Sequence, residues 1–140
     1  MLTFYQWLSE SMERPRFIYT ALKLNDMSHE KLKNELMHEI PEGWKLFCHH
    51  MTINLGEASQ GPAADLVGKE MSLRAIQIGK DEKVMAVKVE SACPSNNAIK
   101  HVTVAVNFAG GGKPKDSNDL KNWIDLPRPI ELTGVVTEIG

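Results

Sequence analysis

The sequence is poor in the features that mark disulfide-rich and membrane-spanning proteins. Its 140 residues include two cysteines, Cys48 and Cys93, which are too few for a disulfide framework. No apolar run approaches the roughly 20 residues that a transmembrane helix needs. Residues 1–16 mix apolar and acidic side chains and lack the basic start of a secretory leader. These absences predict a soluble protein without membrane partners, which we expect in the cytoplasm.

Positive charge is also scarce. The chain has 16 Lys and Arg residues against 18 Asp and Glu residues, which gives a net charge of -2. Proteins that hold long stretches of nucleic acid usually carry a basic stripe, so we expect no extensive duplex binding. A small nucleotide or a strand end stays compatible with this charge, because a cleft can be locally basic in an acidic protein. The 42 % hydrophobic content is ordinary, and we expect residues 1–140 to form a single domain.

The order of the expected elements predicts an α+β fold. A strand over residues 17–24 precedes a helix that Ser28 caps and that buries Leu32, Leu36 and Ile40, with Met37 beside them. Residues 41–43, Pro-Glu-Gly, end this helix. The further strands are expected at residues 45–55, 70–78, 84–90, 100–107 and 130–139, and short helices at 3–14 and 117–123.

Two strand segments repeat one pattern. They are His50-Met-Thr52-Ile and His101-Val-Thr103-Val. Because side chains alternate across a strand, each segment puts His, Thr and a later Asn on one face and apolar residues on the other. The polar faces are His50, Thr52 and Asn54 in the first strand, and His101, Thr103, Ala105 and Asn107 in the second. Two such faces are much rarer by chance than a single one.

This pattern suits cleavage of a phosphodiester bond. Histidine titrates near neutral pH, so a pair can act as general base and general acid, and the sequence leaves open which is which. The hydroxyls of Thr52 and Thr103 can donate hydrogen bonds to the phosphate oxygens. We therefore expect catalytic His50 and His101, substrate-binding Thr52, Thr103, Asn54 and Asn107, and no metal or other cofactor.

The paired His-x-Thr motifs resemble the signature of the 2H phosphoesterase superfamily. The resemblance implies a two-lobed α+β fold with a central cleft and one motif in each lobe. It also implies metal-independent action on 2',3'-cyclic phosphates or 2'-5' linkages, as in RNA end repair or tRNA splicing. The motifs lie 51 positions apart, which is close for the superfamily. The setting of residues 47–50 and the stretch 112–118 are similar to a small phage or RNA-repair subgroup.

Several other side chains are candidates for substrate binding. Tyr19 can stack on a base, and Lys23 can pair with a phosphate if the polar face of the first strand lines the cleft. The glycine-rich loop after the second motif places Lys113 and Lys115 within reach of a second phosphate. For the aromatic residues, core packing is the alternative. The remaining candidates are Trp44, Trp123, Glu131 and Thr133.

Two familiar sites are excluded on geometry. Residues 48–50, Cys-His-His, do not form a zinc site, because successive strand residues face opposite sides and no second ligand pair exists. His29 and His38 are expected to be exposed on the first helix. The run Gly110-Gly-Gly-Lys113 lacks the spacing of a phosphate loop, and Pro114 removes a backbone donor that such a loop needs.

Three functions remain open at this level. The first is a phosphodiesterase that acts on RNA ends or short oligonucleotides. The second is a phage enzyme that degrades cyclic di- or trinucleotide defence signals, which the mild negative charge slightly favours. The third is a non-catalytic RNA-binding module, which the presence of both His and both Thr disfavours. The sequence does not set the base preference or the oligomeric state.

Overall fold

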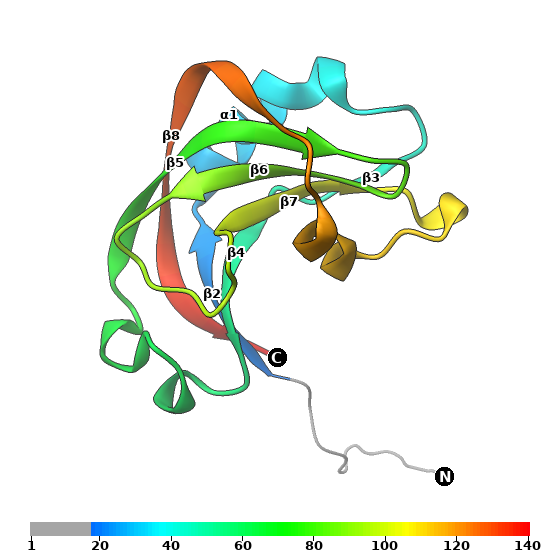
Figure 1. Cartoon of the computed structure of the whole chain (residues 1–140). Helices are drawn as coiled ribbons and strands as arrows, with labels where there is room; N and C mark the ends of the chain where they lie inside the picture. Colours follow the sequence, from blue (N-terminus) through cyan, green and yellow to red (C-terminus); the bar gives the residue numbers. More distant parts are fainter. Residues whose placement is uncertain (1–17) are drawn as a thin grey trace, which may run out of the picture.

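Strands dominate residues 18–140, the part of the chain that the computed structural model describes (Figure 1). The strands are β2 (Tyr19–Leu24), β3 (Lys45–Leu46), β4 (His50–Leu55), β5 (Glu70–Lys80), β6 (Val84–Glu90), β7 (His101–Val106) and β8 (Trp123–Ile139). The helical elements are α1 (Asp26–Leu36) and the 3-10 turns η1 (Met37–Glu39), η2 (Ala58–Gln60), η3 (Ala64–Leu66), η4 (Phe108–Gly110) and η5 (Pro114–Asp119). This content agrees with the α+β expectation. The helix expected at 3–14 lies outside the described residues.

The strands form one closed antiparallel barrel rather than two lobes. Neighbouring strands follow the order β7-β4-β2-β8-β5-β6, and a pairing between β6 and β7 closes the ring, with β3 added at the edge of β7. Both motif strands, β4 and β7, therefore lie side by side in one sheet, where Met51 pairs with Val102. The expectation of one motif in each lobe is wrong for these residues. The closed ring also leaves few unpaired strand edges.

The core fills the inside of this barrel. Alternate residues of the strands point inward and are fully buried, as the alternation of apolar and polar side chains predicts. They include Leu22, Met51, Leu73, Val87, Val102, Val104 and Leu132. Helix α1 adds Leu32 and Leu36 to the same cluster. No helix among residues 18–140 has both the length and the apolar character that a membrane crossing requires.

Helix α1 begins earlier than expected. Asn25 is its N-cap, and the Asn25 side-chain oxygen accepts a hydrogen bond from the backbone N–H of Ser28. Ser28 is therefore not the cap: it lies inside the first turn, and its hydroxyl accepts a hydrogen bond from the N–H of Thr133 on β8. Met37 is 59 % exposed, so it does not join Leu32 and Leu36 in the core. Asn and Ser both favour the N-cap position, so the sequence alone does not decide between Asn25 and Ser28. The structure decides it, because the Ser28 hydroxyl is engaged with β8.

The strand expected at 45–55 is interrupted at Cys48. This residue has a φ of 53°, a left-handed conformation that costs a residue with a Cβ atom roughly 1–2 kcal/mol. The chain turns there, so β3 and β4 are separate strands. A second irregularity follows, where Thr20 pairs with Asn54 and Ala21 with Thr52, which leaves Ile53 as a bulge residue. The alternation of faces therefore fails at both ends of the first motif strand.

The last strand is much longer than expected. The predicted helix over 117–123 is replaced by the 3-10 turn η5, and β8 begins at Trp123 instead of residue 130. Its pairing with β5 shifts between Ala75–Ile130 and Gln77–Asp125, so the single residue Ile76 faces four residues, 126–129. Two of these are prolines, which have no N–H to donate to a neighbouring strand. The prolines obscured the strand in the sequence and explain its irregular pairing.

Candidate active site

A cleft of about 690 Å³ opens on the face of β4 and β7 that is turned away from the core. This volume lies within the roughly 300–1,000 Å³ of small-molecule sites. Residues from β2, β4, β7, the loop 91–100 and η5 surround it. The lining residues are Tyr19, Phe47, His49, His50, Thr52, Asn54, Leu55, Asn96, Asn97, His101, Thr103, Pro114, Lys115 and Asn118. The cleft therefore contains both histidines and both threonines of the duplicated motif.

The loop over residues 91–100 is fastened to the motif strand. The hydroxyl of Ser95 donates a hydrogen bond to the Thr52 carbonyl, and the N–H of Asn96 donates to the Ile53 carbonyl. The Ser95 hydroxyl in turn accepts a hydrogen bond from the N–H of Asn97. These bonds hold Asn96 and Asn97 at the wall of the cleft.

The turn at Cys48 brings an unexpected side chain into the cleft. Strand alternation would place His49 on the face opposite His50, but His49 lines the cleft beside His50, and their Nδ1 atoms lie 2.8 Å apart in a hydrogen bond. The two rings are nearly perpendicular, at 87°. The His50 ring also lies near Tyr19, with 5.2 Å between the ring centroids. His50 thus has two neighbouring rings, those of His49 and Tyr19.

The ring of His101 is fixed by the backbone. Its Nδ1 lies 2.9 Å from the carbonyl oxygen of Ile99. A carbonyl oxygen only accepts, so Nδ1 of His101 carries a proton and donates it in this bond. The other ring nitrogen, Nε2, is then the atom that remains for proton exchange with a substrate. His101 is 8 % exposed, so little of its ring is in contact with bulk water.

Burial lowers the pKa of both motif histidines. The pKa of His50 falls to about 4, chiefly because burial disfavours the charged ring and also because of the nearby His49 and His101. Burial lowers the pKa of His101 as well, while its hydrogen bond to the Ile99 carbonyl acts in the opposite direction. Both rings are thereby biased toward the neutral form near neutral pH. A neutral imidazole has one basic nitrogen that can accept a proton.

The two threonines differ in their surroundings. The hydroxyl of Thr103 lies 2.9 Å from the hydroxyl of Ser117, which is 2 % exposed and belongs to η5. Thr52 has no comparable side-chain partner among residues 18–140, although its carbonyl is bound by Ser95. Turn η5 therefore holds one of the two motif hydroxyls, and the other faces the cleft without such a support.

Asn54 lines the cleft but is bound to its own loop. Its amide nitrogen donates toward the carbonyls of Leu55 and Glu57, both at 3.2 Å. Gly61 lies so close that an added Cβ atom would come 2.2 Å from the side-chain oxygen of Asn54. The amide hydrogens of Asn54 are thus occupied in shaping residues 55–61. They are therefore not free to contact a phosphate, whereas the sequence pattern predicted that Asn54 binds the substrate.

Three expected substrate-binding residues do not line the cleft. Asn107 binds the carbonyl of Glu82 and caps the turn η4. Lys113 is exposed at the start of η5, where its neighbour Lys115 lines the cleft instead. Lys23 is exposed on β2, paired with His50 across the strands, and its charge acts on His49. Of the expected residues, the cleft brings together with the two histidines Tyr19, Thr52, Asn54, Thr103 and Lys115.

Trp44 and the β8 candidates Trp123, Glu131 and Thr133 also lie outside the cleft lining. Trp44 packs against the core, and Trp123 packs its ring over Gly79. Glu131 forms an ion pair with Arg74, with 2.6 Å between Oε2 and Nε. Core packing was the alternative for both tryptophans, and the structure agrees with it. Phe47 supplies an aromatic wall that the sequence did not suggest, and its ring contacts Phe108 at 6.1 Å between centroids.

No group of three His, Cys, Asp or Glu side chains within residues 18–140 is placed to hold a metal ion. His49 and His50 do share the cleft, contrary to the strand alternation that we used against a zinc site. Cys48, however, is turned away: it is fully buried, and its thiol lies 3.9 Å from the Val104 carbonyl. Cys48 therefore does not join His49 and His50 in the cleft.

A family comparison agrees with this geometry. The family model described as the fungal tRNA ligase phosphodiesterase domain matches residues 23–130. The chain belongs to this family. It is therefore a phosphodiesterase of the 2H phosphoesterase type, as the paired motifs suggested. The matched region contains both motifs and runs from the end of β2 to the middle of β8. A comparison with curated proteins found no match.

The turn at Cys48 leads to a stability prediction. Valine at position 48 would place a β-branched side chain in a left-handed conformation that such residues strongly disfavour. We expect Cys48→Val to lower the free energy of unfolding by about 1–2 kcal/mol more than Cys93→Val does. Cys93 is the matched control, because it is also fully buried and free but does not have a positive φ. Urea unfolding measures both variants, and equal losses would contradict a strained turn.

Proposed function

We propose that this phosphodiesterase opens 2',3'-cyclic phosphates at RNA ends without a metal ion. The observation that carries the proposal is that one cleft contains His50, His101, Thr52 and Thr103. The family match to a tRNA ligase domain favours an RNA substrate. The cleft is of a size that suits the end of a strand. The net charge of -2 does not favour binding of a long duplex.

The proposed reaction is a displacement at phosphorus by water. One histidine accepts a proton from the water as its oxygen bonds to phosphorus. The other histidine first takes up a proton from solvent at its free ring nitrogen and, in this protonated form, donates that proton to the ribose oxygen as the P–O bond breaks, so the ring opens to a phosphomonoester. The histidines then exchange one proton with solvent and return to their starting states. General acid and general base each contribute about 10²–10⁴-fold to the rate.

The rest of the cleft suits this substrate. The hydroxyls of Thr52 and Thr103 are proposed to bind the non-bridging phosphate oxygens, and Lys115 adds a positive charge. None of the described lining residues is a carboxylate, so no fixed negative charge repels the phosphate. Tyr19 and Phe47 offer faces on which a base can stack.

A substrate panel tests the proposal. The panel contains RNA with a 2',3'-cyclic end, 2'-5' oligoadenylate, and cyclic di- and trinucleotides, each assayed with and without EDTA. We expect the cyclic-ended RNA to be hydrolysed at the same rate in both conditions. Faster turnover of the cyclic di- or trinucleotides would favour a role in degrading signal molecules. Binding of RNA without turnover, or loss of activity in EDTA, would contradict the proposed reaction.

A further inference from the structure

His49 is a titratable residue of the cleft to which the proposed reaction gives no role. Its Nδ1 lies 2.8 Å from Nδ1 of His50, and both rings line the cleft. A hydrogen bond between two ring nitrogens needs one donor and one acceptor, so the two Nδ1 atoms cannot both be protonated. The protonation state of His50 at Nδ1 is therefore coupled to that of His49.

This contact determines which atom of His50 is left for chemistry. With Nδ1 engaged, Nε2 is the one ring nitrogen of His50 that can exchange a proton with a substrate. We propose that His49 is a positioning residue of the active site: its Nδ1 holds the His50 ring in one orientation and one tautomer, with Nε2 presented to the phosphate. The inference rests on the proposed role of His50, and it adds a third histidine to the two that the motifs identify.

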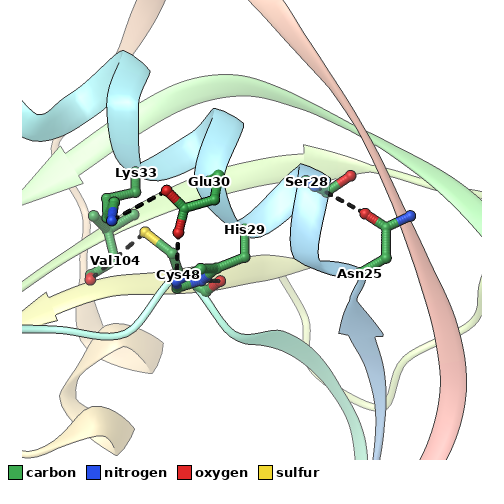
Figure 2. A network of polar contacts seen from close by, with 7 residues as sticks. All are labelled: Asn25, Ser28, His29, Glu30, Lys33, Cys48 and Val104. Carbon is green, nitrogen blue, oxygen red and sulfur yellow. Dashed lines mark hydrogen bonds and ion pairs between the residues drawn. The ribbon is translucent and has the colours of Figure 1, made fainter.

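The position of His49 is supported from two sides. Figure 2 shows Cys48, the residue before it, between helix α1 and Val104 of β7. The carbonyl of Cys48 accepts a hydrogen bond of 2.8 Å from Nδ1 of His29. The carbonyl of His49 itself accepts one of 2.9 Å from the N–H of Leu24 on β2. Helix α1 and β2 thus hold the turn that directs His49 toward His50 instead of toward the core.

The charges around the pair favour a neutral His49. Burial lowers its pKa, and Lys23 on β2 and His29 on α1 lower it further. His50 faces His49, His101 on β7 and Tyr19 on β2, while Lys115 of η5 lines the same cleft. A neutral partner can accept from or donate to His50, whereas a charged one can only donate. Near neutral pH, His49 therefore keeps the acceptor function that stabilises a proton on Nδ1 of His50.

Two substitutions separate the hydrogen bond from the ring. Asparagine at position 49 places a polar atom near the position of Nδ1, whereas alanine removes it. We expect His49→Ala to lower kcat by about tenfold or more with little change in KM, because the loss is one of orientation. We expect His49→Asn to recover most of that loss.

The matched control is His38→Asn, because His38 is exposed on η1, with 72 % of its side chain accessible, and does not line the cleft. This variant is expected to keep the wild-type kcat and pH profile. Circular dichroism and urea unfolding identify any variant that fails to fold. Equal kcat values for His49→Ala and His49→Asn would overturn the positioning role.

A measurement without substrate keeps this inference distinct from the proposed function. In ¹⁵N spectra of the wild-type protein, we expect the His50 ring to show one dominant neutral tautomer. We expect mixed tautomers in His49→Ala and a return to one in His49→Asn. The same His50 spectrum in all three proteins would overturn the inference even if cyclic-ended RNA is the substrate. A tautomer change without any phosphodiester turnover would instead contradict the proposed function alone.

Discussion

His50→Ala and His101→Ala are each expected to lower kcat on cyclic-ended RNA by about 10²–10⁴-fold. Each variant removes a ring that lines the cleft and that is proposed to carry one of the two proton transfers. The double variant is expected to lose little more than either single variant, because residues that act as one unit are not additive. Initial rates at saturating substrate measure all three variants, with His38→Ala as the control for loss of an exposed histidine.

The fold is expected to survive these substitutions. Neither ring belongs to the apolar cluster inside the barrel, so their removal leaves the packing of β4 and β7 intact. Urea-unfolding midpoints close to that of the control His38→Ala would show that the fold is intact. Substantial activity in both single variants, with the fold intact, would contradict a reaction that depends on the histidine pair. Loss in only one of them would show that a single ring performs the proton transfers.

The centre of the site was predictable because it depends on local alternation. His50 and Thr52 on β4, and His101 and Thr103 on β7, share a face for the same reason that Met51 and Val102 share the core. A period of two residues is visible in the sequence without any knowledge of the partner strand. The class of fold was predictable in the same way, since the runs that became β5, β6 and β7 kept nearly the expected ends.

The residues that the sequence misplaced lie where the strand is irregular. Nothing in the sequence marks Cys48 as left-handed, because glycine and asparagine are the usual residues in that conformation. The turn is maintained by tertiary contacts, including the hydrogen bond from His29 (Figure 2). The adjacent pair His49-His50 was the available signal, but strand alternation assigned the two rings to opposite faces. The third histidine of the cleft therefore became evident only from the structure.

The closed barrel is another property that local patterns do not carry. The long strand β8 pairs with both β2 and β5, and β6 pairs with β7 to complete the ring. Such contacts join segments far apart in the sequence, and prolines in the middle of β8 concealed its length. The same strands could form two lobes or one closed barrel. The two folds differ only in which strand edges pair with each other.

The second large effect is expected at the threonines. Valine has nearly the shape of threonine but lacks the hydroxyl, so the substitution tests the donor itself. Removing one hydrogen-bond donor to a developing negative charge costs on the order of 10²-fold in kcat. We expect Thr52→Val and Thr103→Val each to lose about that factor. Steady-state rates on cyclic-ended RNA measure it, and wild-type kcat in both variants would contradict phosphate binding by these hydroxyls.

Stability separates the two variants. Thr103→Val leaves the Ser117 hydroxyl buried without its partner, which costs roughly 1–3 kcal/mol, whereas Thr52→Val breaks no such side-chain pair. Ser117→Ala is the matched variant, since it keeps Thr103 but removes the group that orients it. If Ser117 donates, the Thr103 hydrogen is free for a phosphate oxygen, so Ser117→Ala is expected to lower kcat less than Thr103→Val. A larger loss in Ser117→Ala would assign the phosphate contact to Ser117 instead.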